Sequence, residues 1–463
     1  MSQKNYKNDK SPSFDMMRKI TENPMATIHF VGIGGVSMFS LAELARLGGA
    51  RVTGSDREIS ERTKRLTDLG ITVYNEHKGE NAAGASLVVY SHAIAADNAE
   101  LLYAVENGIP IATRAEYMGA VMLGYKKRIG ISGSHGKSTT VAMLDAIMSR
   151  AGSDPTVLSG AELDLGEPLK VGSKGLMIYE SCEYKDSFLK FSPTVAVGLN
   201  LELDHTDYFE DLPSIQRSFK RALDKATDFA VINGDDVNLR QILHNMQTRV
   251  VKYGAKFDND YRYEITSFRE IGCEFALSKF GSKIGSFEIN IPGSFNVSNA
   301  AAAIVTALEY GVDINVAREA IAAFSGVPRR LEFIGYRRGR AVYYDYAHHP
   351  TEILASIDAL RMLNCRPLTV IFKPHTYSRT KSLWREFVLA LKSADYVILT
   401  DVYAAREPEI QGITSERLAH EIGKNAIYCP DNEVISVLDR YTCGAIVIMG
   451  AGDMELIKKE VLK

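Results

Sequence analysis

Cysteine is scarce in this sequence and has no paired spacing. Only five of the 463 residues are cysteines, and no two of them form a C-x-x-C motif. An odd number of scattered cysteines indicates neither a disulfide framework nor a zinc site. We therefore expect the thiols to stay reduced, as they do in the cytosol.

Long apolar runs and an excess of one charge are also missing. No run approaches the roughly 20 residues that a membrane-spanning helix needs, and segment 1–10 lacks the apolar region of a signal peptide. The chain has 54 Lys and Arg against 57 Asp and Glu, so its net charge of −3 provides no basic excess for a phosphate polymer. These absences predict a cytoplasmic protein whose partners include neither a membrane nor a nucleic acid polymer.

The chain instead alternates short apolar runs with helical patterns. Hydrophobic residues make up 46% of it and charged residues 24%, which is a globular balance, and the length suggests about three domains. Strands that alternate with helices predict an α/β fold with parallel sheets, whereas the polar–apolar alternation of 261–291 predicts a small antiparallel sheet. Turn signals divide the chain into a flexible or loosely helical extension and three domains, at 1–24, 25–123, 124–327 and 328–463.

The segment 130–140, GISGSHGKSTT, joins a predicted strand to a helix expected from Thr139 to about Arg150. Its glycines let backbone N–H groups turn inward, and the helix N-terminus adds partial positive charge. Lys137 supplies a cation for the terminal phosphates, and Ser138 offers a hydroxyl to Mg²⁺. The spacing G-x-x-G-x-x-G-K-S-T departs from the strict phosphate-binding motif, because Ile131 replaces a glycine. A nucleoside triphosphate site is predicted, and the alternative is a glycine-rich turn beside a surface lysine.

A second glycine motif, FVGIGGVS at 30–37, resembles a dinucleotide-binding turn. Asp56 follows at roughly the distance of about 20 residues where a ribose-binding carboxylate belongs. Ser37 replaces the third glycine, so the motif alone is weak. A tight turn without a ligand and a nicotinamide or flavin oxidoreductase both remain open as explanations of this motif.

Taken together, the motifs resemble those of the Mur ligase family, from about residue 27 to residue 453. The matching segments follow the family order: 32–38 (GIGGVSM), 91–94 (SHAI), 133–140 (GSHGKSTT), 180–184 (ESCEY), 200–205 (NLELDH), 292–296 (PGSFN), 345–352 (DYAHHPTE) and 373–379 (KPHTYSR). The resemblance implies a Rossmann-like domain that binds a UDP-sugar, a central P-loop ATPase domain and a C-terminal Rossmann-like domain that binds an amino acid.

Within that family the sequence resembles the branch that joins L-alanine to the carboxylate of UDP-N-acetylmuramate. The implied reaction transfers a phosphoryl group from ATP to that carboxylate, and the amine of L-alanine then displaces phosphate from the acyl phosphate. The resemblance also implies a requirement for Mg²⁺, with Mn²⁺ as a substitute. A monomer or weak homodimer is expected.

The resemblance assigns roles to individual residues. The expected catalytic residues are Lys137, Glu183, His205 and Arg330, and the expected metal ligands are Ser138, Glu183 and His205. The expected ATP-binding residues are Gly133, Ser134, His135, Gly136, Lys137, Ser138, Thr139, Asn296, Asn299 and Asp345. The expected UDP-sugar contacts are Gly34, Gly35, Ser37, Ser55, Asp56, His92 and Arg114, and the expected amino-acid contacts are Tyr346, His348, His375 and Arg379.

Simpler roles stay open for several of these residues. His205 can be an ordinary hydrogen-bonded loop histidine, and Asn299 can cap a helix that begins near Ala300. Phe295 stands where many relatives carry histidine, which removes a hydrogen bond at the expected adenine site.

Three other functions remain as alternatives. A murein tripeptide-recycling ligase of the same family should carry a long insertion after the Glu183-Tyr184 pair, but this sequence continues directly into 187–193. A nicotinamide-dependent oxidoreductase leaves the motif at 133–140 unexplained. A non-catalytic nucleotide-binding protein stays open because of the departures at Ser37 and Phe295.

Overall fold

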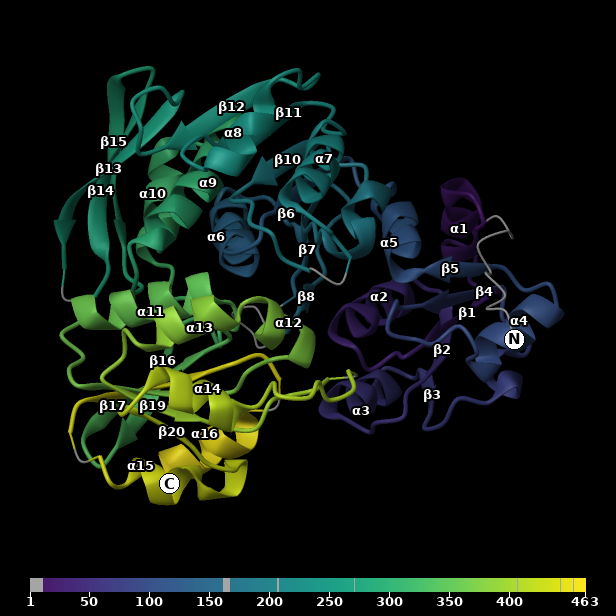
Figure 1. Cartoon of the computed structure of the whole chain (residues 1–463). Helices are drawn as coiled ribbons and strands as arrows, with labels where there is room; N and C mark the ends of the chain where they lie inside the picture. Colours follow the sequence, from purple (N-terminus) through teal and green to yellow (C-terminus); the bar gives the residue numbers. More distant parts are fainter. Residues whose placement is uncertain are drawn as a thin grey trace.

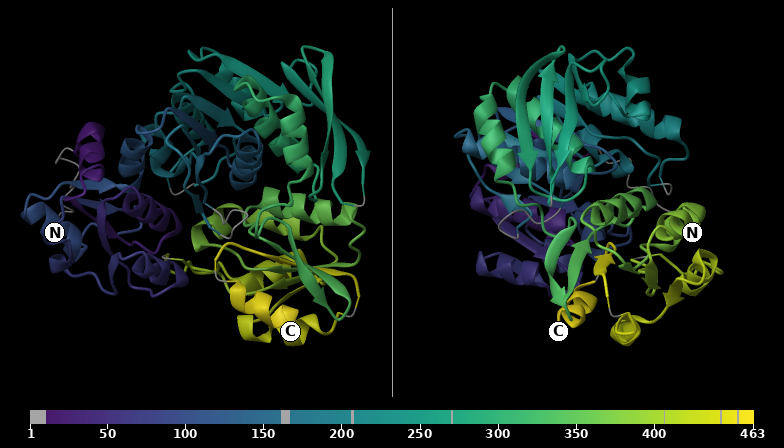
Figure 2. Two further views of the ribbon diagram at one scale, coloured as in Figure 1. Left: turned by 180° about the vertical axis from the view of Figure 1, so that it is seen from behind. Right: turned by 90° about the vertical axis from the view of Figure 1, so that its left-hand side faces the viewer.

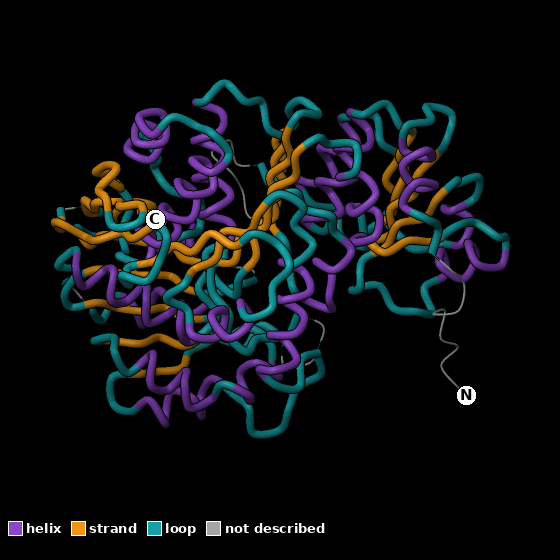
Figure 3. Tube along the Cα trace, turned by 90° about the horizontal axis from the view of Figure 1, so that it is seen from above, coloured by secondary structure: helices purple, strands orange, loops and turns teal. Residues whose placement is uncertain are grey.

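Three groups of apolar strands form three separate sheets, and helices pack against all three sheets (Figures 1 and 3). The computed structural model describes residues 11–160, 167–205, 208–269, 271–405, 407–441, 443–452 and 454–463. The α/β fold class is confirmed. Among the described residues, no helix is both long enough and apolar enough to cross a membrane.

The N-terminal part contains a parallel five-stranded sheet in the order β3-β2-β1-β4-β5. The chain order reverses between β1 and β4, and such a switch point opens a crevice at the carboxyl ends of the strands. Its elements are α1 (Phe14–Thr21), β1 (Thr27–Val31), α2 (Val36–Leu47), β2 (Arg51–Ser55), α3 (Glu61–Asp68), β3 (Thr72–Tyr74), η2 (Gly79–Ala82), β4 (Leu87–Tyr90), α4 (Ala99–Glu106), β5 (Ile111–Thr113) and α5 (Arg114–Met122).

The expected N-terminal extension contains a docked helix. Ser13 caps α1 by accepting a hydrogen bond from the N–H of Met16, and the side chain of Met17 is fully buried. The hydroxyl of Thr21 lies 3.3 Å from that of Tyr117 on α5. Residues 11–24 therefore pack against the first domain, and residues 1–10 lie outside the described residues.

The central part contains one ten-stranded sheet in the order β15-β14-β13-β12-β11-β10-β6-β9-β7-β8. The expected antiparallel strands at 261–291 are present, and they continue the parallel sheet through the parallel pair of β12 and β13. Its elements are β6 (Lys127–Ser132), α6 (Lys137–Arg150), β7 (Thr156–Leu158), β8 (Leu169–Lys170), β9 (Leu176–Glu180), η3 (Tyr184–Lys190), β10 (Val195–Gly198), α7 (Leu212–Leu223), β11 (Phe229–Asn233), α8 (Val237–Leu243), β12 (Val250–Gly254), β13 (Tyr261–Phe268), β14 (Cys273–Lys279), β15 (Ser282–Ile289), α9 (Phe295–Glu309) and α10 (Ile314–Ala322).

The C-terminal part contains a six-stranded sheet in the order β16-β17-β21-β18-β19-β20, in which only β16 is antiparallel to its neighbour. Its elements are β16 (Glu332–Arg337), β17 (Arg340–Asp345), α11 (Pro350–Met362), β18 (Leu368–Phe372), α12 (Tyr377–Ser382), α13 (Trp384–Leu391), β19 (Tyr396–Leu399), α14 (Ser415–Ile422), β20 (Ala426–Tyr428), η4 (Asp431–Glu433), α15 (Val434–Leu438), β21 (Ala445–Met449) and α16 (Glu455–Leu462).

The three parts meet around a cavity of about 490 Å³. The first part contributes Val36 and Arg65, the central part contributes Lys137 and Glu183, and the last part contributes Arg379. In the left view of Figure 2 the C-terminal part lies below the central part, and the N-terminal part lies to the side of both. Because loops after parallel strands converge at their carboxyl ends, this arrangement gathers polar side chains at one place.

Candidate active site

The glycine-rich turn between β6 and α6 is the centre of the site, and we call residues 133–136 the phosphate loop. Gly136 has a φ of +83°, and a Cβ there would lie 2.5 Å from the Oδ1 of Asn299, so only glycine fits. The N–H of His135 donates to the Oδ1 of Asn200 at 2.8 Å, and the Nδ2 of Asn200 donates back to the His135 carbonyl at 3.0 Å. Helix α6 begins directly after this turn at Lys137, two residues before the predicted start at Thr139.

The ammonium group of Lys137 lies inside the loop. It donates to the carbonyls of Gly133 and Ser134, and its Nζ is 3.3 and 3.4 Å from the two carboxylate oxygens of Glu183. Burial alone would lower the pKa of Lys137, but the negative charge of Glu183 outweighs it and leaves the pKa raised. The lysine is therefore a fixed cation at the N-terminus of α6.

Glu183 and His205 come from loops that follow two different strands, β9 and β10, and they meet beside Lys137. The carboxylate of Glu183 is buried, and its Oε1 lies 3.5 Å from the Nε2 of His205. Burial works to raise the pKa of Glu183, but the charge of Lys137 leaves that pKa lowered, so the group stays ionised. Together with Ser138, which lines the same cavity, they provide a carboxylate, an imidazole and a hydroxyl.

A second cavity of about 300 Å³ adjoins the phosphate loop and contains the expected adenosine residues. Asn299 donates to the Oδ1 of Asn296 at 3.0 Å, and Asn296 donates to the carbonyl of Pro292 at 2.7 Å. Helix α9 begins at Phe295, not near Ala300, and its N-cap is Ser294. Asn299 is thus inside the helix, and the alternative role as a cap is wrong.

Asp345 closes this second cavity from the C-terminal part. Burial raises its pKa to about 6, and its Oδ2 accepts a 2.5 Å hydrogen bond from the hydroxyl of Ser356. Arg330 lines both cavities, and one of its terminal nitrogens donates to the Oγ of Ser138 at 3.2 Å. The guanidinium of Arg330 also lies over the ring of Tyr346, at 5.1 Å from its centre. An arginine of the inter-domain segment is thereby aimed at the phosphate loop.

The four expected amino-acid residues also come together, and we call them the amino-acid pocket. Arg379 pairs with Asp204 at 3.1 Å, and its other terminal nitrogen lies 3.3 Å from the Nδ1 of His375. The rings of His348 and His375 are 5.8 Å apart, and Tyr346 packs against His348. Burial, together with the positive charges of His348 and Arg379, lowers the pKa of His375 to about 3, so this imidazole is neutral.

The seven expected UDP-sugar residues do not line the large cavity. Asp56 accepts a 2.8 Å hydrogen bond from the N–H of Gly34, which fixes the second glycine turn. Ser55 is fully buried and donates to Glu100 at 2.7 Å. Of the other four residues, Gly35 is the N-cap of α2 and Ser37 lies in its first turn, whereas His92 lies in the loop after β4 and Arg114 begins α5.

Two arginines of α3, which the sequence analysis missed, line the cavity instead. Arg62 donates to the carbonyl of Gly34 at 2.9 Å, and Arg65 pairs with Glu43 at 2.7 Å and with Glu167 of the central part. The run ERTKR at 61–65, which begins five residues after Asp56, was the signal in the sequence that could have identified them. These arginines place positive charge at the end of the cavity nearest the second glycine turn.

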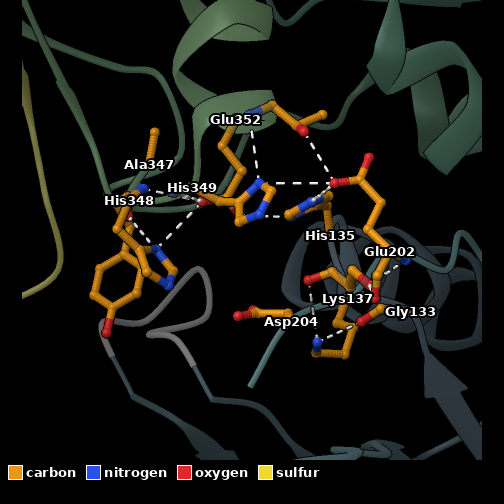
Figure 4. A network of polar contacts seen from close by, with 12 residues as sticks. Gly133, His135, Lys137, Glu202, Asp204, Ala347, His348, His349 and Glu352 are labelled. Carbon is orange, nitrogen blue, oxygen red and sulfur yellow. Dashed lines mark hydrogen bonds and ion pairs between the residues drawn. The ribbon is translucent and has the colours of Figure 1, made fainter. Parts of the chain in front are cut away.

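A cluster of two histidines and two glutamates bridges the central and C-terminal parts (Figure 4). The ring of His135 lies between Glu352, 3.0 Å from its Nδ1, and Glu202, 3.3 Å from its Nε2, and His349 packs beside it. Burial alone would lower the pKa of His135, but the hydrogen bonds to the two carboxylates raise it to about 9. His135 is thus an imidazolium at neutral pH.

This shift predicts a pH-dependent stability. The pKa of His135 is raised above its unfolded value of about 6.5, so its contribution is complete below that pH and is lost as the pH rises through about 9. His135→Gln should therefore lower the melting temperature most at about pH 6 to 6.5, progressively less as the pH rises, and hardly at all near pH 10. Thermal unfolding between pH 6 and 10 measures this, with His420→Gln on the exposed side of α14 as the control. A melting-temperature difference that stays constant across this range would contradict the assignment.

Comparisons with known proteins agree with this geometry. Residues 27–126, 131–307 and 329–458 match the models of the Mur ligase family catalytic domain, the Mur ligase middle domain and the Mur ligase glutamate ligase domain. The chain is 40% identical to the UDP-N-acetylmuramate–L-alanine ligase of Alkaliphilus metalliredigens, over 95% of this chain and 98% of that one. It is 41% identical to the ligase of the same name from Caldicellulosiruptor bescii, over 94% and 99% of the two chains.

Comparison with solved structures also identifies ligases with a similar fold. The UDP-N-acetylmuramate–alanine ligase of Thermotoga maritima superposes with a TM-score of 0.80 at 27% identity, over 94% of this chain and 98% of that one. A murein peptide ligase from Psychrobacter arcticus superposes with a TM-score of 0.71 at 26% identity, with the same coverage. Three matched domains in order, around a cavity to which all three parts contribute, place this chain in the Mur ligase family.

Proposed function

We propose that the chain joins L-alanine to the carboxylate of UDP-N-acetylmuramate, with ATP as the source of energy. The observation that carries this proposal is the shared wall between two cavities. Asp204, His205 and Arg379 line both the large cavity, which contains Lys137 and Glu183, and a smaller cavity of about 200 Å³ that contains His375. A phosphoryl group held at the phosphate loop and an amino acid held at Arg379 would thus meet in one space.

In the first step the muramoyl carboxylate attacks the terminal phosphorus of ATP, and the bond to the bridging oxygen breaks to release ADP. Phosphoryl transfer depends mainly on positioning and on stabilising negative charge. Lys137 and Arg330 face this region from two different domains and can neutralise charge on the transferred group. The product is an acyl phosphate, which is a reactive mixed anhydride.

A divalent cation fits beside these groups. The buried carboxylate of Glu183, the imidazole of His205 and the hydroxyl of Ser138 would hold it, and the ion would supply charge neutralisation for the phosphates. Mg²⁺ prefers oxygen ligands, and the imidazole makes Mn²⁺ a suitable substitute.

In the second step the amine of L-alanine attacks the acyl carbon, and the C–O bond to phosphate breaks. The planar guanidinium of Arg379, whose terminal nitrogens contact Asp204 and His375 in this structure, is a group that suits the carboxylate of an amino acid. The neutral ring of His375 and the ring of His348 stand around the same space. The small volume of the cavity around His375 favours a short side chain such as that of alanine.

We also propose that the chain acts in the cytoplasm, where ATP and nucleotide-linked sugars are found, in the synthesis of a peptidoglycan precursor. The boundaries near residues 123 and 327 and the monomeric or weakly dimeric state remain predictions.

The alternative activity, that of a murein tripeptide-recycling ligase, agrees less well with the named relatives and with the loop after Glu183. The relatives that are 37–41% identical over nearly the whole chain are named UDP-N-acetylmuramate–L-alanine ligase. Glu183 and Tyr184 lead directly into η3, which leaves no room for an insertion that would accommodate a peptide. A nicotinamide-dependent oxidoreductase would leave the phosphate loop without a role.

Phosphate release tests the proposed function. With UDP-N-acetylmuramate and Mg²⁺-ATP present, L-alanine should stimulate release at least about tenfold more than L-glutamate or the murein tripeptide, because the amino-acid pocket is small. Omission of UDP-N-acetylmuramate is the control and should remove the stimulation. Equal stimulation by the three amines would contradict the substrate assignment.

A further inference from the structure

One carboxylate touches both loops on which the proposed reaction depends. Glu352 lies in the first turn of α11, and its Oε2 accepts the backbone N–H groups of His348 and His349 at 3.0 and 3.1 Å. The same oxygen is 3.2 Å from the Nδ1 of His348. Its other oxygen, Oε1, lies 3.0 Å from the Nδ1 of His135 in the phosphate loop. Glu352 therefore binds the backbone of the loop that carries Tyr346 and His348, and it also binds the ring of His135 in the phosphate loop.

His135, the phosphate-loop residue that Glu352 contacts, is also held by residues of the central part. Glu202 lies 3.3 Å from the Nε2 of His135 and also accepts a 2.9 Å hydrogen bond from the hydroxyl of Thr351. Asn200 binds both the N–H and the carbonyl of His135. A movement of α11 away from the central domain must therefore break the contacts of His135, and a movement of His135 is transmitted to α11.

A metal ion is the other occupant that this cluster suggests, since ligand atoms of His135, Glu202 and His349 lie within 4.8 Å of one another. Each ring nitrogen of His135, however, already faces a carboxylate oxygen, and the raised pKa of His135 keeps both nitrogens protonated at neutral pH. A protonated ring donates two hydrogen bonds and has no lone pair for a metal. Both ring nitrogens of His135 thus have carboxylate partners, which makes an ion-paired clamp, although the buried Nε2 of the neighbouring His349 has no hydrogen-bond partner among the described residues.

We propose that Glu352 is a positioning residue that couples the phosphate loop to the amino-acid pocket through His135. The proposal rests on the proposed function. A nucleotide that orders the phosphate loop would thereby also order the loop bearing His348, so the amine would find its pocket formed only when the phosphoryl donor is in place. Among the described residues, Glu352 lines the large cavity with Lys137 and Arg379 but forms no hydrogen bond or ion pair with either, so we assign its effect to the two loops that it binds.

A double-mutant cycle tests the coupling. Glu352→Gln keeps an oxygen for the backbone N–H groups but loses the charge that faces His135, and His135→Gln removes the same contact from the other side. Each variant should raise the KM for L-alanine about tenfold and lower kcat about tenfold, and the double variant should match the worse single variant. The KM for UDP-N-acetylmuramate should stay within about twofold, because the first domain does not touch the cluster. Glu386→Gln, an exposed position on α13, is the matched control.

The outcomes separate the two proposals. If the wild type releases phosphate with L-alanine, the function stands. The coupling is then refuted if the double variant shows the product of the two single effects on kcat and KM. It is also refuted if the substitutions change the KM values for L-alanine and UDP-N-acetylmuramate equally. If the wild type shows no alanine-dependent release, the proposed function fails, and the coupling fails with it. Thermal unfolding of each variant confirms that the protein measured is folded, and the two single variants probe the contact independently.

Discussion

Lys137→Ala should lower kcat by about a thousandfold and leave the binding of UDP-N-acetylmuramate unchanged. The loss is large because Lys137 is a fixed, mostly enclosed cation at the N-terminus of α6, where its charge acts on the transferred group with little screening by water. Binding of the sugar nucleotide should survive because the first domain has its own sheet and its own glycine turn. Turnover is measured by phosphate release, and binding by calorimetry without ATP.

The substitution also leaves Glu183 buried without its cation, which costs stability. Thermal unfolding must therefore accompany the kinetics, and Lys126→Ala, an exposed position just before β6, provides the matched control. Loss of sugar-nucleotide binding together with turnover, in a variant that is still folded, would show that the domain roles are wrongly assigned.

Arg330→Lys should lower kcat by about a hundredfold, although the positive charge is retained. The arginine reaches the Oγ of Ser138 from the segment between two domains, and its plane lies on the ring of Tyr346. Lysine has neither the planar fork nor the stacking surface, so its charge would not be held at the phosphate loop. Steady-state kinetics over a range of ATP concentrations measures the effect.

Arg385→Lys, an exposed position on α13, is the control for this substitution and should behave like the wild type. An increase in the KM for ATP with an unchanged kcat would mean that Arg330 only helps to bind the nucleotide. In that case its proposed part in stabilising the transferred group would be wrong.

The phosphate loop could be predicted from the sequence because its parts are neighbours in the chain. Residues 133–136 lie between β6 and α6, Lys137 and Ser138 begin α6, and each residue type has a local reason to be there. The start of α9 was harder to predict, because its first five residues include two asparagines and a serine, which favour turns and caps over helix interiors. Tertiary packing of the buried alanines that follow extends the helix back to Phe295.

Contacts between distant residues set the limit of prediction. The sequence predicts that Ser55 ends β2. It does not predict that the hydroxyl of Ser55 binds Glu100 on α4 instead of a ligand. His135 and Glu352 are 217 positions apart, so their contact exists only once two domains have met. The resemblance to a family supplied the residues of the amino-acid pocket, but it did not indicate the clamp that joins them to the phosphate loop.

The cavity that contains Asn296 and Asn299 has walls from two domains, with Asp345 and Arg330 on the far side. The central domain alone therefore holds only part of the machinery for cleaving a nucleotide. If one domain held the complete site, water could take the place of the substrate carboxylate, and ATP would be hydrolysed between turnovers. Dividing the site between two domains limits this wasteful hydrolysis, because the groups of Arg330 and Asp345 act on the nucleotide only while the two domains are in contact.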